Sequence, residues 1–297
     1  MEQCGTKVWT YELLDWINIE KIDWRELSRN PNAIHLLEEN KDKINWEELS
    51  INPNAIHLLE KNPDEIDWRG LSRNPNGIHK VINNPEKINW YSLSANPDAI
   101  HFLKENIDKI DWVTLSVNPK AISLLEKNQE MIDWEILSQN PKAIGLLENN
   151  QEKIDWEILS QNPNAIDLLE KNQDKICWYF LSGNPNAIDL LEKNLGKIDW
   201  EYLSGNRNAI HLLEKNPSKI DGGWLSLNQN AMSLLEKNPE KIDWRLLSSN
   251  PSIFTKKINY KYLYQRMNVI REELMMKCMH PRRLERWLEM GGDMDDF

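Results

Sequence analysis

Five histidines come nearest to a metal-binding or acid–base pattern in this sequence. They share one 22-residue register, at His35, His57, His79, His101 and His211. A zinc site needs imidazole nitrogens about 2 Å from one ion, whereas stacked helical repeats place neighbouring histidines roughly 10 Å apart. We therefore expect an exposed histidine row that can respond to pH, and no metal site.

Residues of other catalytic types are not arranged for catalysis. The sequence has no glycine-rich phosphate loop, and no serine, histidine and acid trio other than the repeat itself. Cys177 stands where other copies have Asp or Asn before a helix. A thiol there can be reactive, but a substituted helix cap is the simpler interpretation. We expect neither enzyme activity nor a cofactor.

These residues belong to a 22-residue repeat that accounts for most of the chain. One register position holds Trp from Trp24 to Trp200 without an insertion, Gly222 interrupts the series, and Trp244 resumes it. Leu and Ser follow three and four residues later in all eleven copies. A repeat of fixed length predicts a solenoid, in which each unit packs on its neighbours.

Each unit is predicted to contain two short helices. Asn30-Pro31 suits the start of a helix of about nine or ten residues, and Asn40 suits a left-handed end. Asp23 is placed to cap a second helix of one or two turns, α or 3₁₀, with Glu26 as its reciprocal partner. Helices this short are marginal alone. The predicted fold is therefore an all-α solenoid of two-helix units that stack on one another.

Both ends of the chain depart from the repeat. We predict an N-terminal capping repeat in residues 1–23, the solenoid in 24–250, and a C-terminal helical cap with an acidic tail in 251–297. Units about 8–10 Å apart would give a rod or superhelix on the order of 80–100 Å long. The Trp, Leu and Ile columns should form its core, and the Ser and Asn columns should make caps and inter-repeat hydrogen bonds.

Composition favours a soluble protein that binds other proteins. The chain is 40% hydrophobic and 28% charged, and no apolar run approaches a membrane span. Three cysteines without metal spacing, and no secretory signal, suggest a reducing compartment. A net charge of -11 opposes nucleic-acid binding, which normally needs a clustered basic face.

In a repeat protein the variable columns are where we expect partners to bind. Two residues after the Trp position, the column changes from polar to apolar in the middle of the array. If exposed, this apolar stripe marks an interaction site and a possible homo-oligomer contact; if the short helix is tucked in, the stripe is core. A second variable column carries the histidines, and a third precedes each Asn-Pro. The candidate binding residues are Ile136, Ile158, Phe180, Tyr202, Trp224, Leu246, His35, His57, His79, His101, Asp167, Asp189 and His211.

The run LSxNPNAIxLLEKNxDKIDW, found at residues 159–178 apart from Cys177, resembles repeat proteins of nucleocytoplasmic large DNA viruses, the giant viruses. The endings of such proteins look like the C-terminal His280-Pro281, Arg283, Trp287 and Gly291 here. The resemblance implies a viral protein that acts in the host cytoplasm or is packed in the virion. In architecture alone, the unit also resembles the leucine-rich variant class, in which α and 3₁₀ helices alternate.

We therefore predict a non-catalytic scaffold or adaptor that binds a viral or host protein, without membrane association. The alternatives are a structural protein of the virion, such as a minor capsid protein, and a nucleic-acid-binding helical repeat protein.

Overall fold

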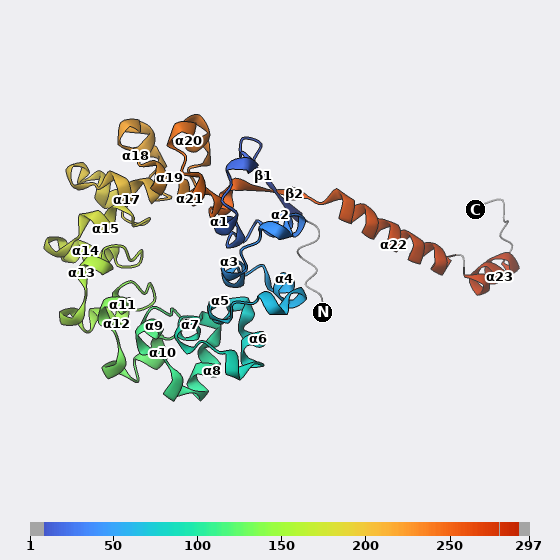
Figure 1. Cartoon of the computed structure of the whole chain (residues 1–297), viewed down its shortest axis with the longest axis horizontal. Helices are drawn as coiled ribbons and strands as arrows, with labels where there is room; N and C mark the ends of the chain where they lie inside the picture. The colour runs from blue at the N-terminus through green and yellow to red at the C-terminus, as the bar shows by residue number, and fades with distance from the viewer. Residues whose placement is uncertain (1–8, 279, 291–297) are drawn as a thin grey trace. The chain divides into compact units, whose positions relative to one another are not determined.

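The computed structural model describes residues 9–278 and 280–290, which fall into two compact units. Residues 13–254 form the repeat unit, and the described residues of the terminal unit are 9–12, 255–278 and 280–290. The repeat unit confirms the predicted all-α solenoid with a 22-residue period (Figure 1).

Each repeat contains two α-helices and a 3₁₀ turn. The first helix starts at the Trp position: α1 (Trp24–Ser28), α3 (Trp46–Ile51), α5 (Trp68–Arg73), α7 (Trp90–Ser94), α9 (Trp112–Ser116), α11 (Trp134–Ser138), α13 (Trp156–Leu159), α15 (Trp178–Ser182), α17 (Trp200–Gly205), α19 (Gly222–Leu227) and α21 (Trp244–Ser248). The second helix follows the Asn-Pro position: α2 (Ile34–Glu39), α4 (Ile56–Lys61), α6 (Ile78–Ile82), α8 (Ile100–Glu105), α10 (Ile122–Leu125), α12 (Ile144–Glu148), α14 (Ile166–Lys171), α16 (Ile188–Glu192), α18 (Ile210–Lys215) and α20 (Met232–Lys237).

The 3₁₀ turns lie at two places. Most connect the second helix to the next Trp position: η1 (Ile19–Lys21), η2 (Lys41–Lys43), η3 (Pro63–Glu65), η5 (Pro85–Lys87), η7 (Ile107–Lys109), η8 (Gln129–Met131), η9 (Gln151–Lys153), η10 (Gln173–Lys175), η11 (Leu195–Lys197), η12 (Pro217–Lys219) and η13 (Pro239–Lys241). Three others start at the Pro of Asn-Pro: η4 (Pro75–Gly77), η6 (Pro97–Ala99) and η14 (Pro251–Ile253).

The start of the first helix was predicted correctly in part. Asp23 caps α1, because its Oδ1 accepts the N–H of Glu26 at 2.9 Å. The reciprocal bond from Glu26 was predicted wrongly. The backbone N–H of Asp23 instead donates to Ser248 Oγ at 2.9 Å, just as Asn45 donates to Ser28 Oγ in the next repeat. The Ser column therefore links neighbouring repeats.

The second helix is shorter than predicted. The helix α2 has six residues, because Asn30-Pro31 forms a turn ahead of it in which Asn30 Oδ1 accepts the N–H of Asn32 at 3.0 Å. The left-handed end was also predicted wrongly, since Asn40 has φ of -128°. Its Nδ2 instead donates to the carbonyl of Leu36 at 2.9 Å, which satisfies one of the terminal carbonyls of the helix.

Leucine and alanine columns, rather than tryptophan, fill the core. In the first repeat Leu27, Ala33 and Leu37 are 0% exposed. The Trp column, predicted as core, is half-buried, and Lys43 Nζ lies 4.5 Å from the ring centroid of Trp24. The same cation–π pair recurs at Lys87–Trp68, Lys153–Trp134, Lys175–Trp156, Lys197–Trp178 and Lys219–Trp200. The indoles therefore lie at the surface, under lysine side chains.

Buried asparagines join each repeat to the one before it, as predicted for the Asn column. Asn162 Nδ2 donates to the carbonyls of Ser138 and Asn140, at 2.9 and 3.1 Å, and its Oδ1 accepts the N–H of Asn164 at 3.0 Å. We call the whole column the asparagine ladder: Asn30, Asn52, Asn74, Asn96, Asn118, Asn140, Asn162, Asn184, Asn206, Asn228 and Asn250, all at most 2% exposed. Within the described residues, no buried side-chain nitrogen or oxygen lacks a hydrogen-bond partner.

The ladder closes on itself, so the repeat unit is a ring. Asn30 Nδ2 donates to the carbonyls of Ser248 and Asn250, both at 3.0 Å, which is the same pattern across the junction. Lys21 Nζ lies 5.1 Å from the ring centroid of Trp244, repeating the cation–π pair there. The helix α1 contacts α21 as it contacts α3. Figure 1 shows the helices of the repeat unit returning to their starting point.

The eleventh repeat is assembled from both ends of the repeat unit. Residues 244–253 supply its first part, through η14, and residues 14–23 supply the remainder, through η1. The two parts are joined by the N–H of Leu14, which donates to the carbonyl of Ile253 at 2.9 Å. Leu58 makes the same bond to Ala55 inside a continuous repeat, also at 2.9 Å. Ten continuous repeats, residues 24–243, and one composite repeat therefore complete the ring.

Closure corrects two predictions about the ends. The rod or superhelix with free ends is wrong, because the first and last repeats pack on each other. Residues 14–23 do not cover an exposed end of the stack; they complete the composite repeat. Within a ring each repeat has two neighbours, so the described residues need no capping repeat for the solenoid.

The terminal unit contains a strand pair and two helices. Strands β1 (Trp9–Leu13) and β2 (Phe254–Ile258) form a two-stranded sheet, in which Lys257 Nζ pairs with Glu12 at 2.7 Å. The helices are α22 (Tyr260–Cys278) and α23 (Pro281–Glu289). The predicted acidic tail, from Asp293 on, lies outside the described residues.

Gly222 replaces Trp in one repeat, and the structure shows how the gap is filled. A Cβ at Gly222 would overlap the backbone carbonyl of Lys241. Lys241 is the residue that lies over the indole in other repeats, and here its Nζ donates to the carbonyl of Ile220 at 3.2 Å. The space of the missing indole is therefore occupied by backbone.

We predict that Asn30→Ala and Asn162→Ala destabilise the protein equally, each by about 2–4 kcal/mol, because each leaves one buried serine carbonyl and one N–H without their partners and removes one of the two hydrogen bonds to a buried asparagine carbonyl. Urea unfolding followed by circular dichroism measures the change. In an open solenoid Asn30 would be a terminal position, so a much smaller loss for Asn30→Ala than for Asn162→Ala would contradict closure.

We also predict that Gly222→Trp, which restores the repeat consensus, destabilises the ring by about 1–3 kcal/mol or more, because overpacking displaces backbone. Gly145→His is the matched control: it also restores a frequent residue of its column, and nothing lies within 4 Å of a Cβ at Gly145. Its stability should stay within about 0.5 kcal/mol of wild type. Thermal unfolding compares the two, and a stabilised Gly222→Trp variant would show that our account of Lys241 is wrong.

Candidate functional site

The odd-numbered helices line the inner side of the ring, and the even-numbered helices lie outside them (Figure 1). Neighbouring odd-numbered helices also contact each other more closely than neighbouring even-numbered ones, as expected where the circumference is smaller. The odd-numbered helices have a solvent-exposed side, which we call the inner face: Tyr91, Val113 and Tyr179, each one residue after a Trp, are 53%, 49% and 43% exposed.

Helix spacing sets the scale of the ring. Eleven spacings of about 8–10 Å give a circumference of about 90–110 Å, and so a diameter of about 30 Å between helix axes. Subtracting one helix diameter of about 10–12 Å leaves an opening on the order of 20 Å. This estimate exceeds the diameter of about 10–12 Å of one α-helix.

Four aromatic side chains from three neighbouring repeats meet on the inner face, and we call them the aromatic cluster: Tyr179, Phe180, Tyr202 and Trp224. The ring of Tyr202 lies 4.0 Å from that of Tyr179, 5.6 Å from that of Phe180 and 4.6 Å from that of Trp224, measured between centroids. Trp224 Nε1 donates to Glu201 Oε1 at 3.2 Å. Pairs at these distances stabilise one another beyond simple burial.

Two glycines make room for the large rings. A Cβ at Gly205 would lie 3.0 Å from Trp224 Cε3, and one at Gly183 would lie 3.4 Å from Tyr202 Cδ1. The rings of Tyr202 and Trp224 therefore each pack on the residue that precedes the buried Asn of the neighbouring repeat. At other junctions the same two columns meet as Arg29 with Glu48, 4.0 Å apart, and as Ile51 with Gly70.

This packing answers the question that the sequence left open about the apolar stripe. Ile136, Ile158, Phe180, Tyr202, Trp224 and Leu246 are all half-buried, so the stripe is neither a fully exposed face nor core. The column before each Asn-Pro, predicted from the sequence as a third variable column where partners could bind, supplies part of the surface on which the stripe packs. Sequence reasoning missed Tyr179, although Tyr in place of the usual charged residue was a visible signal.

On another part of the inner face the side chains are charged. Arg245 pairs with Glu26 across the ring junction at 3.5 Å. Beside it, Arg25 pairs with Glu48 of the next repeat at 3.1 Å, and Arg29 pairs with Glu26 of its own repeat at 3.8 Å. These pairs are exposed at the arginine end, so each contributes little to stability. They give the ring one charged sector and one aromatic sector.

The predicted histidine row lies on the outer helices, and all five side chains are exposed. His57 Nε2 lies 3.0 Å from Glu38 Oε1, and His211 Nε2 lies 2.8 Å from Glu192 Oε1, each in the preceding repeat. Asp167 and Asp189 are exposed on α14 and α16. The candidate residues therefore form two surfaces, the inner stripe and the outer His and Asp column, and they do not form one site.

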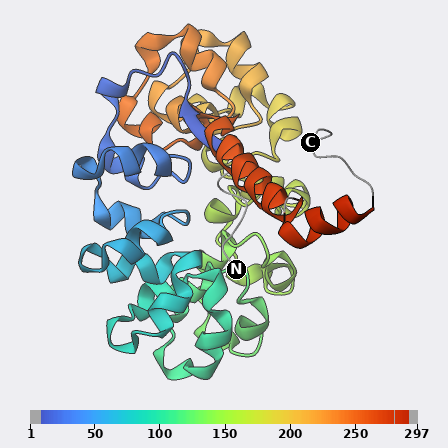
Figure 2. The same cartoon turned by 90° about the vertical axis from the view of Figure 1, so that its right-hand side faces the viewer.

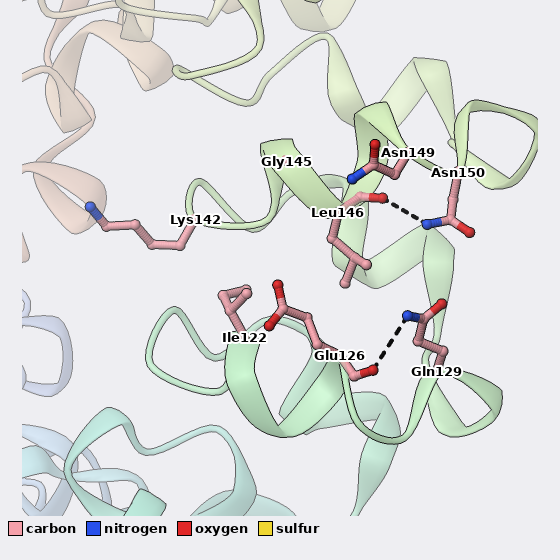
Figure 3. A pocket seen from close by; sticks show the side chains of 8 residues that line it. All are labelled: Ile122, Glu126, Gln129, Lys142, Gly145, Leu146, Asn149 and Asn150. Carbon is pink, nitrogen blue, oxygen red and sulfur yellow. Dashed lines mark hydrogen bonds between the residues drawn. The ribbon is translucent and has the colours of Figure 1, made fainter.

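An outer hollow of about 460 Å³ lies between α10 and α12, where Gly145 stands in the histidine column. Figure 3 shows Ile122 and Glu126 on one side of it and Leu146 on the other. The amides of Asn150 and Gln129 donate to the backbone carbonyls of Leu146 and Glu126, so they serve helix ends and are not aimed at a ligand. The hollow results from a missing side chain.

Other chemistry finds little support in the described part of the chain. Across residues 9–278 and 280–290, no group of three or more His, Cys, Asp or Glu side chains could hold a metal ion, and none of the helices described there is long and apolar enough to cross a membrane. Cys177 is half-buried at the start of α15 and makes no side-chain capping bond.

No protein-family model matches the chain, and no curated protein or solved structure matches it either.

The aromatic cluster has one measurable electrostatic property. The side-chain hydrogen bond with Tyr202, together with desolvation and the negative charges of Glu201 and Asp199, raises the pKa of Tyr179 to about 12. A raised folded-state pKa means that the protonated phenol stabilises the folded protein fully below pH 10. This contribution is lost as the pH rises from 10 through about 12.

We predict that Tyr202→Phe returns the pKa of Tyr179 toward 10, because it removes the hydrogen-bond partner. Titration followed by the ultraviolet absorbance of tyrosinate should show a late ionisation step in the wild type that moves to lower pH in the variant. Tyr91→Phe is the control and should keep the late step. A Tyr202→Phe variant that still shows the late step would contradict this assignment.

Proposed function

We propose that the protein is a non-catalytic ring-shaped scaffold that binds a segment of another protein on its inner face. The observation that carries this proposal is the aromatic cluster, which brings together four large side chains from three repeats, with Tyr179 43% exposed and the other three half-buried. Tyr and Trp are among the residues that most often contribute a large share of the binding energy at protein–protein interfaces.

The cluster favours a protein partner for two physical reasons. Its rings are held by each other and by Gly183 and Gly205, so little side-chain entropy is lost when a partner docks. Glu135, Glu157 and Glu201 stand beside the apolar stripe on the same face, exposed to solvent. An amphipathic segment with apolar and basic side chains fits this arrangement, whereas the negative charge opposes a nucleic acid.

Closure of the ring adds a constraint on the partner. The ring of described repeats is closed and has no gap through which a partner could enter from the side. A partner segment therefore reaches the inner face either by passing through the opening or by inserting a terminus or a loop into it. The inner face thus selects for a narrow segment, and bulky globular partners are excluded from it.

The setting that we propose is viral, on the basis of the sequence resemblance, with action in the host cytoplasm or in the virion. Abundance separates the two settings: a structural virion protein would be stoichiometric in purified particles, whereas an adaptor would be found mainly in the host cell.

We predict that Tyr179→Ala combined with Trp224→Ala weakens binding of a cognate segment by at least tenfold, because both side chains belong to the aromatic cluster. Peptides selected from a phage-displayed random library on the wild-type ring would be measured against each variant by calorimetry. Tyr91→Ala, which removes an exposed inner tyrosine outside the cluster, is the control and should bind as wild type does.

Circular dichroism must show that the double variant keeps its helices. If the selected peptides bind the folded double variant as tightly as the wild type, the aromatic cluster is not the binding surface. If no peptides are selected, or if those selected lack apolar side chains, the proposed function fails.

A further inference from the structure

The 19-residue helix α22 (Tyr260–Cys278) exposes an unusual amount of apolar surface. Exposed fractions reach 73% for Tyr260, 67% for Met267, 52% for Ile270 and 61% for Leu274. Most of the stability of a helix in a protein comes from the packing of its apolar side chains. An apolar surface that remains exposed to this extent marks an interaction site.

The spacing of these side chains identifies the kind of partner. Tyr260, Leu263, Met267, Ile270 and Leu274 follow one another at intervals of three, four, three and four residues. This heptad spacing keeps five side chains on one narrow seam and is the pattern by which two helices pack side by side. None of the helices of the repeat unit has the length to carry it.

The residues that flank the seam favour pairing of α22 with itself in antiparallel orientation. In that orientation Met267 packs against Ile270 of a second copy, and Leu263 packs against Leu274. At the flanking positions, Arg266 then lies opposite Glu273 of the second copy and can form an ion pair with it. Tyr264 lies opposite Arg271 of the second copy and can form a cation–π pair. Each pair occurs twice by symmetry. A parallel pair would instead place Arg266 opposite Arg271, with repulsion.

We propose that two copies of this protein associate through antiparallel pairing of their α22 helices. The inference is independent of the proposed function, because it uses the terminal unit alone. The dimer would carry two rings, and a partner with two copies of the recognised segment would then bind by avidity.

The size of the contact sets the expected affinity. Nineteen residues make a helix about 28 Å long, and five apolar layers are fewer than a permanent coiled coil normally uses. We therefore expect a dissociation constant on the order of micromolar.

The test is sedimentation equilibrium of the full chain over about 1–100 μM, with three sets of variants. Arg266→Glu alone and Glu273→Arg alone should each weaken the dimer by about tenfold, because two attractive contacts become repulsive. The double variant Arg266→Glu/Glu273→Arg should restore it. A strengthened dimer for Arg266→Glu alone would overturn the antiparallel arrangement, since in a parallel pair this change removes repulsion.

Apolar variants test the seam itself. Met267→Glu/Ile270→Glu places four carboxylates at the centre of the contact and should abolish the dimer. Val269→Glu/Met276→Glu is the matched control, because these residues are equally exposed, at 54% and 68%, and lie away from the seam on the same helix. A monomeric wild type at the highest concentration, or equal loss in the control, would overturn the proposal. Circular dichroism checks that each variant keeps its helices.

Discussion

A buried amide that donates to two carbonyls of the preceding repeat is the interaction on which this structure depends. Each such asparagine is at most 2% exposed, and each joins the end of a short first helix to the same place in the preceding repeat. An unpaired carbonyl at such a position costs about 1–3 kcal/mol. The ladder therefore fixes the distance and rotation between repeats more strictly than apolar packing alone could.

The closure of the ring follows from this fixed distance and rotation between neighbouring repeats. If every junction applies the same rotation, a solenoid without axial rise returns to its start, and here it does so after eleven repeats. The last repeat is built from residues 244–253 and 14–23. The ends of the repeat array are therefore held by the same hydrogen bonds as its middle, and the cost of free terminal faces, which open solenoids meet with capping repeats, does not arise.

The variable columns have two origins that the sequence does not separate. On the inner face, the large ring of Trp224 fits because the residue it packs on, Gly205, has no side chain. Part of the sequence variation in these two columns therefore keeps the packing between neighbouring repeats intact. On the outer face, exposed side chains such as those at His101 and Asp167 vary with little packing consequence. Only the side chains left open to solvent after this packing, Tyr179 among them, are free to recognise a partner.

Sequence reasoning correctly predicted the period, the two helices per repeat, the Asp23 cap and the role of the Asn column, because each depends on contacts within one unit or with its nearest neighbour. It did not determine the length of the second helix, since Asn30-Pro31 suits a turn and a helix start equally well. It also did not reveal the ring or the aromatic cluster. A periodic sequence is the same in a straight rod and in a ring, because curvature arises from the small difference in spacing between inner and outer helices, summed over eleven junctions. The total curvature over the eleven junctions is visible in the three-dimensional structure alone. It determines which columns lie on the inner helices and which residues contact Tyr202. It also brings residues 14 and 253 together in one repeat.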